Sequence, residues 1–153
     1  MRICVQEEQE KFWKVFEKKL IENGEPFSIL YKKAGKVTYW AVVNKNHSFV
    51  DNALSVDLLA RERKLRINIY VRDNLALFAR FERNKSAVQS MISVPVEWRQ
   101  GTTNPNTRRI AYEIPIRVGY AQGYAEIIDK VLPVIVEMKA VCEAYAKNEF
   151  FDF

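Results

Sequence analysis

The sequence predicts an α+β fold in which a mostly antiparallel sheet of five to six strands is flanked by three helices. Strand-like runs follow one another through short polar turns, and three segments place apolar residues at helical spacing. Strands joined by short turns pair antiparallel, and the helices then cover one face of the sheet. With 153 residues the chain has room for one substantial core. We therefore expect a single domain over residues 1–153.

The N-terminal part begins with a helix over residues 6–23. Its apolar stripe consists of Phe12, Trp13, Phe16 and Leu20. Gly24 ends the helix, because glycine adopts the left-handed cap conformation at little cost. Strand-like runs follow at residues 27–31, 37–43 and 53–60, and the polar turn 61–64 leads into the next strand.

Residues 64–98 form the unit around which the fold is organised: a strand, a helix and a second strand. In the first strand, one face is apolar and carries Leu65, Ile67, Ile69 and Val71. Asp73 or Asn74 can cap the helix that follows, because a short side-chain oxygen accepts from free backbone N–H groups. That helix runs to about Met91, and Pro95 prevents its continuation into the second strand, residues 94–98.

The C-terminal part starts with a loop at residues 99–107, where Gly, Asn and Pro cluster. A strand at 108–118 follows, and Pro115 predicts an edge or a bulge because proline has no N–H to donate. The last helix spans 124–147, and Pro133 should kink or split it. The aromatic tail 148–153 or the last helix could serve as an interface between copies of the chain.

Composition excludes some classes of protein and leaves others open. No run of apolar residues reaches the roughly 18 that a membrane-spanning helix needs. The first residues lack the pattern of a secretory signal, so the expected location is cytoplasmic. Cys4 and Cys142 have no nearby Cys or His, and His47 is the only histidine, so we expect two free thiols and no metal or cofactor. A net charge of +5 permits a polyanionic partner but does not require one.

Basic residues gather on predicted turns and at the start of a late strand. They are Lys32, Lys33, Lys36, Arg61, Arg63, Lys64, Arg66, Arg108 and Arg109. Such side chains can neutralise phosphates of DNA or RNA, and Tyr39, Trp40, Tyr70 or Trp98 could stack on bases. The alternative is that basic residues occupy turns simply because turns are hydrated.

One constellation resembles a metal-dependent nuclease. Restriction-endonuclease-like enzymes place an Asp on one strand and Glu-x-Lys on the next, so that carboxylates hold Mg²⁺. Here Asp57 is followed by Glu62 and Lys64, and the order of elements is compatible with that topology. The spacing is short, however, and the strand position that should carry an acid is Asn68. We therefore assign no catalytic residue.

A longer pattern resembles a known family. It comprises a Phe-Trp helix, a strand with the pattern Arg-hydrophobic-acid-hydrophobic-Tyr, a helix with a late Lys, a strand ending in Trp and an Arg-Ile strand. The matching residues are Phe12, Trp13, Arg66, Tyr70, Phe78, Lys85, Trp98, Arg109 and Ile110. This pattern is similar to the domain-of-unknown-function family 4268, although Asn68 departs from it where an acid is usual. Members stand alone or follow predicted nuclease domains, so the resemblance implies a bacterial accessory role near nucleic acid, with no activity attached.

The function that we expect is a nucleic-acid-associated accessory or interaction module without catalysis. Two alternatives stay open: a degenerate or metal-dependent nuclease-like protein, and a structural protein that associates with itself.

Overall fold

The computed structural model describes residues 4–22, 28–29, 39–43, 52–117 and 121–150. In these residues the helices are α1 (Val5–Glu22), α2 (Leu75–Arg83), α3 (Lys85–Met91) and α4 (Ala121–Phe150). The strands are β1 (Ser28–Ile29), β2 (Tyr39–Val43), β3 (Asn52–Leu59), β4 (Lys64–Arg72), β5 (Glu97–Gln100) and β6 (Thr107–Pro115). None of the described helices is long and apolar enough to cross a membrane.

The described strands form one antiparallel sheet in the order β1-β2-β3-β4-β6-β5. The body of this sheet is β2, β3, β4 and β6, whereas β1 and β5 are short strands at the two edges. β4 lies at the centre, with Ile67 opposite Val56 on β3 and Tyr112 on β6. The α+β class with a mostly antiparallel sheet is therefore confirmed.

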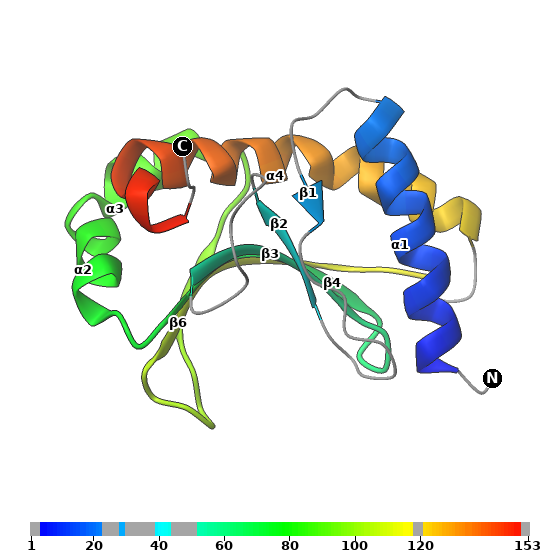
Figure 1. The fold of residues 1–153 in the computed structure, drawn as a ribbon, viewed down its shortest axis with the longest axis horizontal. Helices are drawn as coiled ribbons and strands as arrows, with labels where there is room; N and C mark the ends of the chain where they lie inside the picture. Colours follow the sequence, from blue (N-terminus) through cyan, green and yellow to red (C-terminus); the bar gives the residue numbers. More distant parts are fainter. Residues whose placement is uncertain (1–3, 23–27, 30–38, 44–51, 118–120, 151–153) are drawn as a thin grey trace.

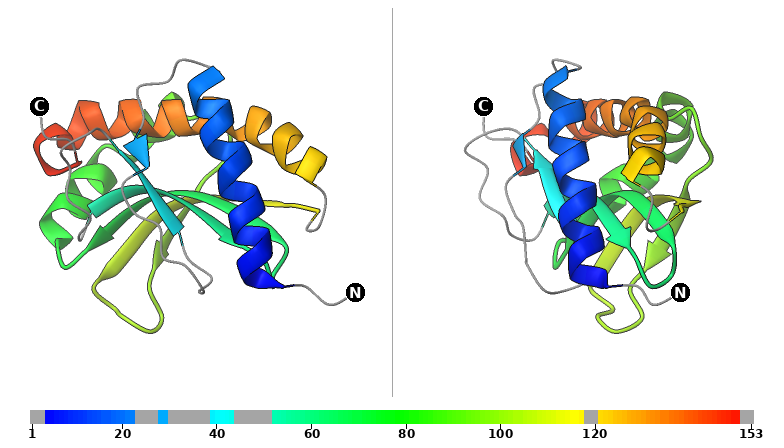
Figure 2. Two further views of the ribbon diagram at one scale, coloured as in Figure 1. Left: turned by 45° about the vertical axis from the view of Figure 1, so that its right-hand side comes forward. Right: turned by 90° about the vertical axis from the view of Figure 1, so that its right-hand side faces the viewer.

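The helices lie on one face of the curved sheet, as Figures 1 and 2 show. The expected apolar face of β4 is buried there, since Leu65, Ile67, Ile69 and Val71 have almost no solvent exposure. The α1 stripe, which runs from Phe12 to Leu20, packs into the same core. Burial of this apolar surface is the main stabilising contribution to the fold.

The segment after β4 forms two helices rather than one, so the described helices number four and the expected three is wrong. Asn74, not Asp73, is the N-cap, and its Oδ1 accepts from the N–H of Leu77 at 3.1 Å. The break falls at Asn84, whose side chain donates to the carbonyl of Arg80. An Asn side chain that bonds locally in this way competes with helix continuation.

β5 begins three residues later than expected, at Glu97. Ser93 explains the shift, because its N–H and its hydroxyl both donate to the carboxylate of Glu137 on α4. This contact ties the chain to the helix before the strand can start.

Of the two outcomes expected at Pro133, a kink or a split, the split is wrong. α4 continues through Pro133, and its non-helical backbone lies at Ala146 instead (φ −153°, ψ 36°). Pro133 and Asp129, whose carbonyl loses its helical partner, are both on the solvent side, where water can satisfy that carbonyl.

Candidate functional site

The face of the sheet opposite the helices is polar along the central strand. Arg66, Asn68 and Tyr70 alternate with the core residues of β4, so they lie on this second face. Across the ladder, Asp57 and Glu113 flank Arg66 on the two neighbouring strands. The face therefore presents paired charges where the core face presents apolar side chains.

Three side chains form a buried polar network beneath this face. Ser55, Asp57 and Asn68 are each almost fully buried. The Asp57 carboxylate accepts from the Ser55 hydroxyl at 2.9 Å and from the Asn68 amide at 3.1 Å. The same amide nitrogen of Asn68 also lies 3.2 Å from the Ser55 carbonyl. Buried polar groups cost stability unless they are bonded, and these are bonded to one another.

Two arginines from different strands meet on this network. Nε of Arg66 on β4 donates to Oδ2 of Asp57 at 2.7 Å, and Nη1 of Arg109 on β6 lies 3.7 Å from the same oxygen. Arg109 also donates to Oδ1 of Asn68 at 2.5 Å, and its guanidinium lies 4.4 Å from the centre of the Tyr70 ring. One carboxylate thus faces two guanidinium groups.

A third arginine, Arg99 on β5, is held by two acids. It donates to Glu113 at 2.8 Å and to Glu97 at 2.7 Å. The hydrogen bond with Glu113 raises the pKa of Arg99 above its usual value, and the same bond lowers the pKa of Glu113 below its usual value. Glu113 also lies 3.7 Å from Lys64.

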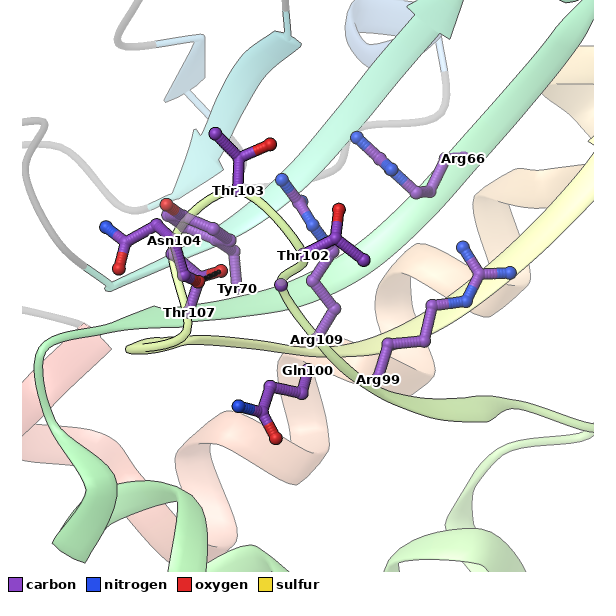
Figure 3. A pocket seen from close by; sticks show the side chains of 10 residues that line it. Arg66, Tyr70, Arg99, Gln100, Thr102, Thr103, Asn104, Thr107 and Arg109 are labelled. Carbon is purple, nitrogen blue, oxygen red and sulfur yellow. Dashed lines mark hydrogen bonds between the residues drawn. The ribbon is translucent and has the colours of Figure 1, made fainter.

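These three arginines line one pocket of about 380 Å³. Figure 3 shows them approaching it from three strands, with the loop after β5 on the other side. The lining consists of Arg66, Tyr70, Arg99, Gln100, Gly101, Thr102, Thr103, Asn104, Thr107 and Arg109. No Asp or Glu is among these lining residues, because Asp57 and Glu113 bond the arginines from outside the lining. The lining therefore offers guanidinium N–H donors from which an anion can accept hydrogen bonds.

The loop that walls this pocket is held by its own hydrogen bonds. The N–H of Gly101 donates to the Thr107 carbonyl at 2.9 Å, and both the N–H and the hydroxyl of Thr107 donate to the Asn104 carbonyl. Gly101 has no room for a side chain, since an added Cβ would lie 1.9 Å from the Thr107 hydroxyl. The loop geometry is consequently built into the fold.

A larger hollow, of about 610 Å³, lies between the end of β6 and the start of α4. Its charged lining residues are of both signs, namely Arg117, Glu126, Asp129 and Lys130. It therefore has no preference for one charge, and the arginine-lined pocket is the better candidate.

The structure separates the basic residues that the sequence grouped together. Arg66 and Arg109 reach the pocket, but Arg108 points to the other face and donates to the carbonyls of Pro105 and Thr107. The turn that holds Arg61, Arg63 and Lys64 lies at the opposite end of β4 from the loop. Lys32, Lys33 and Lys36 lie outside the described residues, as does His47.

Arg99 and the loop residues Thr102, Thr103 and Asn104 were missed by reasoning from the sequence. A lone Arg at the start of a polar loop carries no signal, and its neighbours look like ordinary turn residues. Only the pairing of β5 with β6 brings Arg99 opposite Arg109.

The two acids of the nuclease hypothesis, Asp57 and Glu62, lie in different surroundings. Asp57 is buried and bonded to Ser55, Arg66 and Asn68, whereas Glu62 is exposed in the turn after β3. No group of three metal-ligating side chains occurs among the described residues. The geometry favours a charge-balancing role for Asp57 over binding of Mg²⁺.

The structure describes both cysteines as free: Cys4 is exposed and Cys142 is buried on α4. Burial raises the pKa of the Cys142 thiol, which keeps it protonated. Self-association through α4 or the tail stays a prediction. Residues 151–153 of that tail lie outside the described part of the chain.

Comparison with known proteins gives one family and one distant structural neighbour. The model of the family DUF4268, a domain of unknown function, matches residues 8–146. No curated protein matches the sequence. Among solved structures, the chain is similar to YbjN, a candidate transcription regulator from E. coli, at 10% identity and a TM-score of 0.40. That similarity covers 84% of this chain and 92% of YbjN.

Proposed function

The chain belongs to the DUF4268 family, and from this premise we propose that it is an accessory module that binds nucleic acid through the polar face of its sheet. The contact surface consists of the arginine-lined pocket and the basic turn before β4. The module acts by binding and not by catalysis.

The single observation that supports this proposal is the set of three arginines around one pocket with no acid in its lining. Guanidinium groups pair with phosphate through two parallel hydrogen bonds, which makes arginine the preferred residue for such contacts. The exposed Arg61 and Arg63 add positive charge at the turn before β4, next to Lys64 at the start of that strand. A polyanion with several phosphates can contact the pocket and the basic turn at the same time.

Binding of a short single-stranded oligonucleotide, followed by fluorescence anisotropy at increasing salt, tests the proposal. Affinity should fall as salt rises, because phosphate contacts release counterions. Arg99→Gln should weaken binding and reduce the salt slope by about one unit, as expected for loss of one phosphate contact. Arg83→Gln is the matched control, since this exposed arginine lies on α2, which packs on the other face of the sheet.

Affinity that does not change with salt, or equal binding by Arg99→Gln and the unmodified chain, would contradict a contact at this face. The same samples incubated with Mg²⁺ or Mn²⁺ report on the nuclease alternative. Cleavage that disappears in Asp57→Asn would favour that alternative.

A further inference from the structure

We propose that the arginine-lined pocket binds one nucleotide through a terminal phosphomonoester. The group could be the phosphorylated end of a strand or a free nucleoside monophosphate, which share this chemistry. The inference rests on the proposed contact with nucleic acid and names the chemical group that the pocket recognises.

The guanidinium donors that line the pocket suit the terminal oxygens of a phosphomonoester better than those of an internal phosphodiester. Arg66, Arg99 and Arg109 all line it, and three carboxylates outside the lining pair with them: Asp57 with Arg66 and Arg109, and both Glu97 and Glu113 with Arg99. Nε of Arg66 is used by Asp57, so its two terminal nitrogens are available as donors. A phosphomonoester carries a charge of about −1.5 to −2 at neutral pH and three terminal oxygens that accept hydrogen bonds. A diester in the backbone carries a single charge.

The size of the pocket sets the second limit. Its volume of about 380 Å³ lies near the lower end of the range for small-molecule sites. One nucleotide fits such a volume, whereas a duplex does not. Thr102 and Thr103 on the loop supply hydroxyls, and Asn104 an amide, for the polar groups of a sugar or a base.

The arginines are held in place before any ligand arrives. Asp57 orients Arg66, Asn68 and Tyr70 hold Arg109, and Glu113 holds Arg99. Because Arg109 already stacks on Tyr70, this ring serves to position the guanidinium instead of acting as a free platform for a base. Side chains that are ordered in advance lose less entropy on binding, so the site is suited to selective recognition.

The test compares oligonucleotides of one sequence that carry a 5′-phosphate, a 3′-phosphate or hydroxyls at both ends, each with an internal fluorophore. A phosphorylated strand should bind more tightly than the hydroxyl-ended strand by roughly tenfold, because it adds charge-assisted hydrogen bonds. Arg99→Gln should remove this difference, and Arg83→Gln should keep it. Thr102→Ala gives a second variant, which alters the exposed loop without touching the ion pairs.

Competition by a free nucleoside monophosphate distinguishes the two sources of the group. Displacement of the strand by the free nucleotide at similar concentration, with no effect of the nucleoside, assigns the pocket to free nucleotides and upholds the inference. Preference for the phosphorylated strand assigns it to strand ends. Equal affinity for phosphorylated and hydroxyl-ended strands, together with no competition by the nucleotide, would overturn the inference while leaving salt-dependent binding intact. If no strand binds at all, the proposed function fails, and the nucleotide alone then decides whether the pocket takes a phosphomonoester.

Discussion

The turn before β4 and the pocket on the polar face of the sheet both carry basic residues, but they hold them in different ways. At the turn before the strand, Arg61 and Arg63 are exposed, and no ion pair or hydrogen bond of either side chain is recorded in the described residues. At the pocket, the carboxylates of Asp57 and Glu113 fix Arg66, Arg99 and Arg109. Free cations attract any polyanion, whereas oriented guanidinium groups can select one shape of anion. The same residue type thus supports long-range attraction at the turn and recognition at the pocket.

The largest effect is expected from removing Asp57, the acid that Arg66 and Arg109 share. Asp57→Ala should lower the free energy of unfolding by about 3–5 kcal/mol, because it leaves partly buried charge without its partner. Urea denaturation measures this loss. Asp129→Ala is the control, since the Asp129 side chain is 55% exposed and its pair with Lys19 contributes about 1 kcal/mol or less. Similar losses in the two variants would show that Asp57 does not organise the site.

A smaller effect is expected from adding a side chain at Gly101, where there is no room for one. An added methyl group would lie 2.5 Å from the Asn104 carbonyl as well as against the Thr107 hydroxyl, so the loop must shift. Gly101→Ala should cost about 1–3 kcal/mol, as overpacking usually does, and should weaken binding at the pocket. Thermal unfolding and anisotropy measure the two effects. Unchanged affinity in a folded Gly101→Ala protein would show that the loop is no part of the site.

Neutralising the basic turn and the pocket in separate variants tests whether the two sites bind in different ways. The double variant Arg61→Gln/Arg63→Gln should weaken oligonucleotide binding by roughly twofold to fivefold at low salt and by little at high salt, because exposed charges are screened. Arg99→Gln should weaken binding at both salt concentrations. Titrations at two ionic strengths distinguish these cases. If the loss of affinity changes with salt to the same extent in both variants, the turn and the pocket do not bind in different ways.

The smallest expected effect concerns pH. The hydrogen bond from Arg99 lowers the pKa of Glu113 in the folded protein, so Glu113 stabilises the fold above its ordinary pKa. This contribution disappears as the pH falls below about 4.5 and the carboxylate becomes protonated. Glu113→Gln should therefore lose about 1 kcal/mol or less at neutral pH and approach the stability of the unmodified protein in acid. Unfolding curves at neutral and at acid pH test this prediction. A difference in the free energy of unfolding that stays the same at both pH values would exclude the Arg99–Glu113 pair as its cause.

Much of the fold could be predicted because its signals are local. Alternation along Leu65 to Val71 predicted which face of β4 is buried, and Asn74 was correctly among the two candidates for the helix cap. The predictions that were wrong, the start of β5 and the split of α4 at Pro133, depended on features of the folded structure. Glu137 on α4 holds Ser93 and delays β5, and exposure of Asp129 lets water satisfy the carbonyl that Pro133 leaves without a helical partner.

The candidate site was predictable only in part. Arg66 and Arg109 belonged to the expected basic surface, and both reach the pocket. Asn68 was noted only because it lacks the charge of an acid. In the structure its amide connects Asp57 with Arg109, which is a role that no local pattern reveals.

The class of fold, the buried face of the central strand and the excess of basic residues can all be read from the order of the amino acids alone. These properties follow from the spacing of apolar residues and from composition, which need no knowledge of distant partners. Which basic side chains come together at the pocket depends on the tertiary fold. Strand order and register bring together Asp57, Arg66, Arg99 and Arg109 from four strands, and leave the basic turn outside the pocket lining. Pairing between strands far apart in the chain is a global property, because it depends on how the whole sheet buries its apolar face.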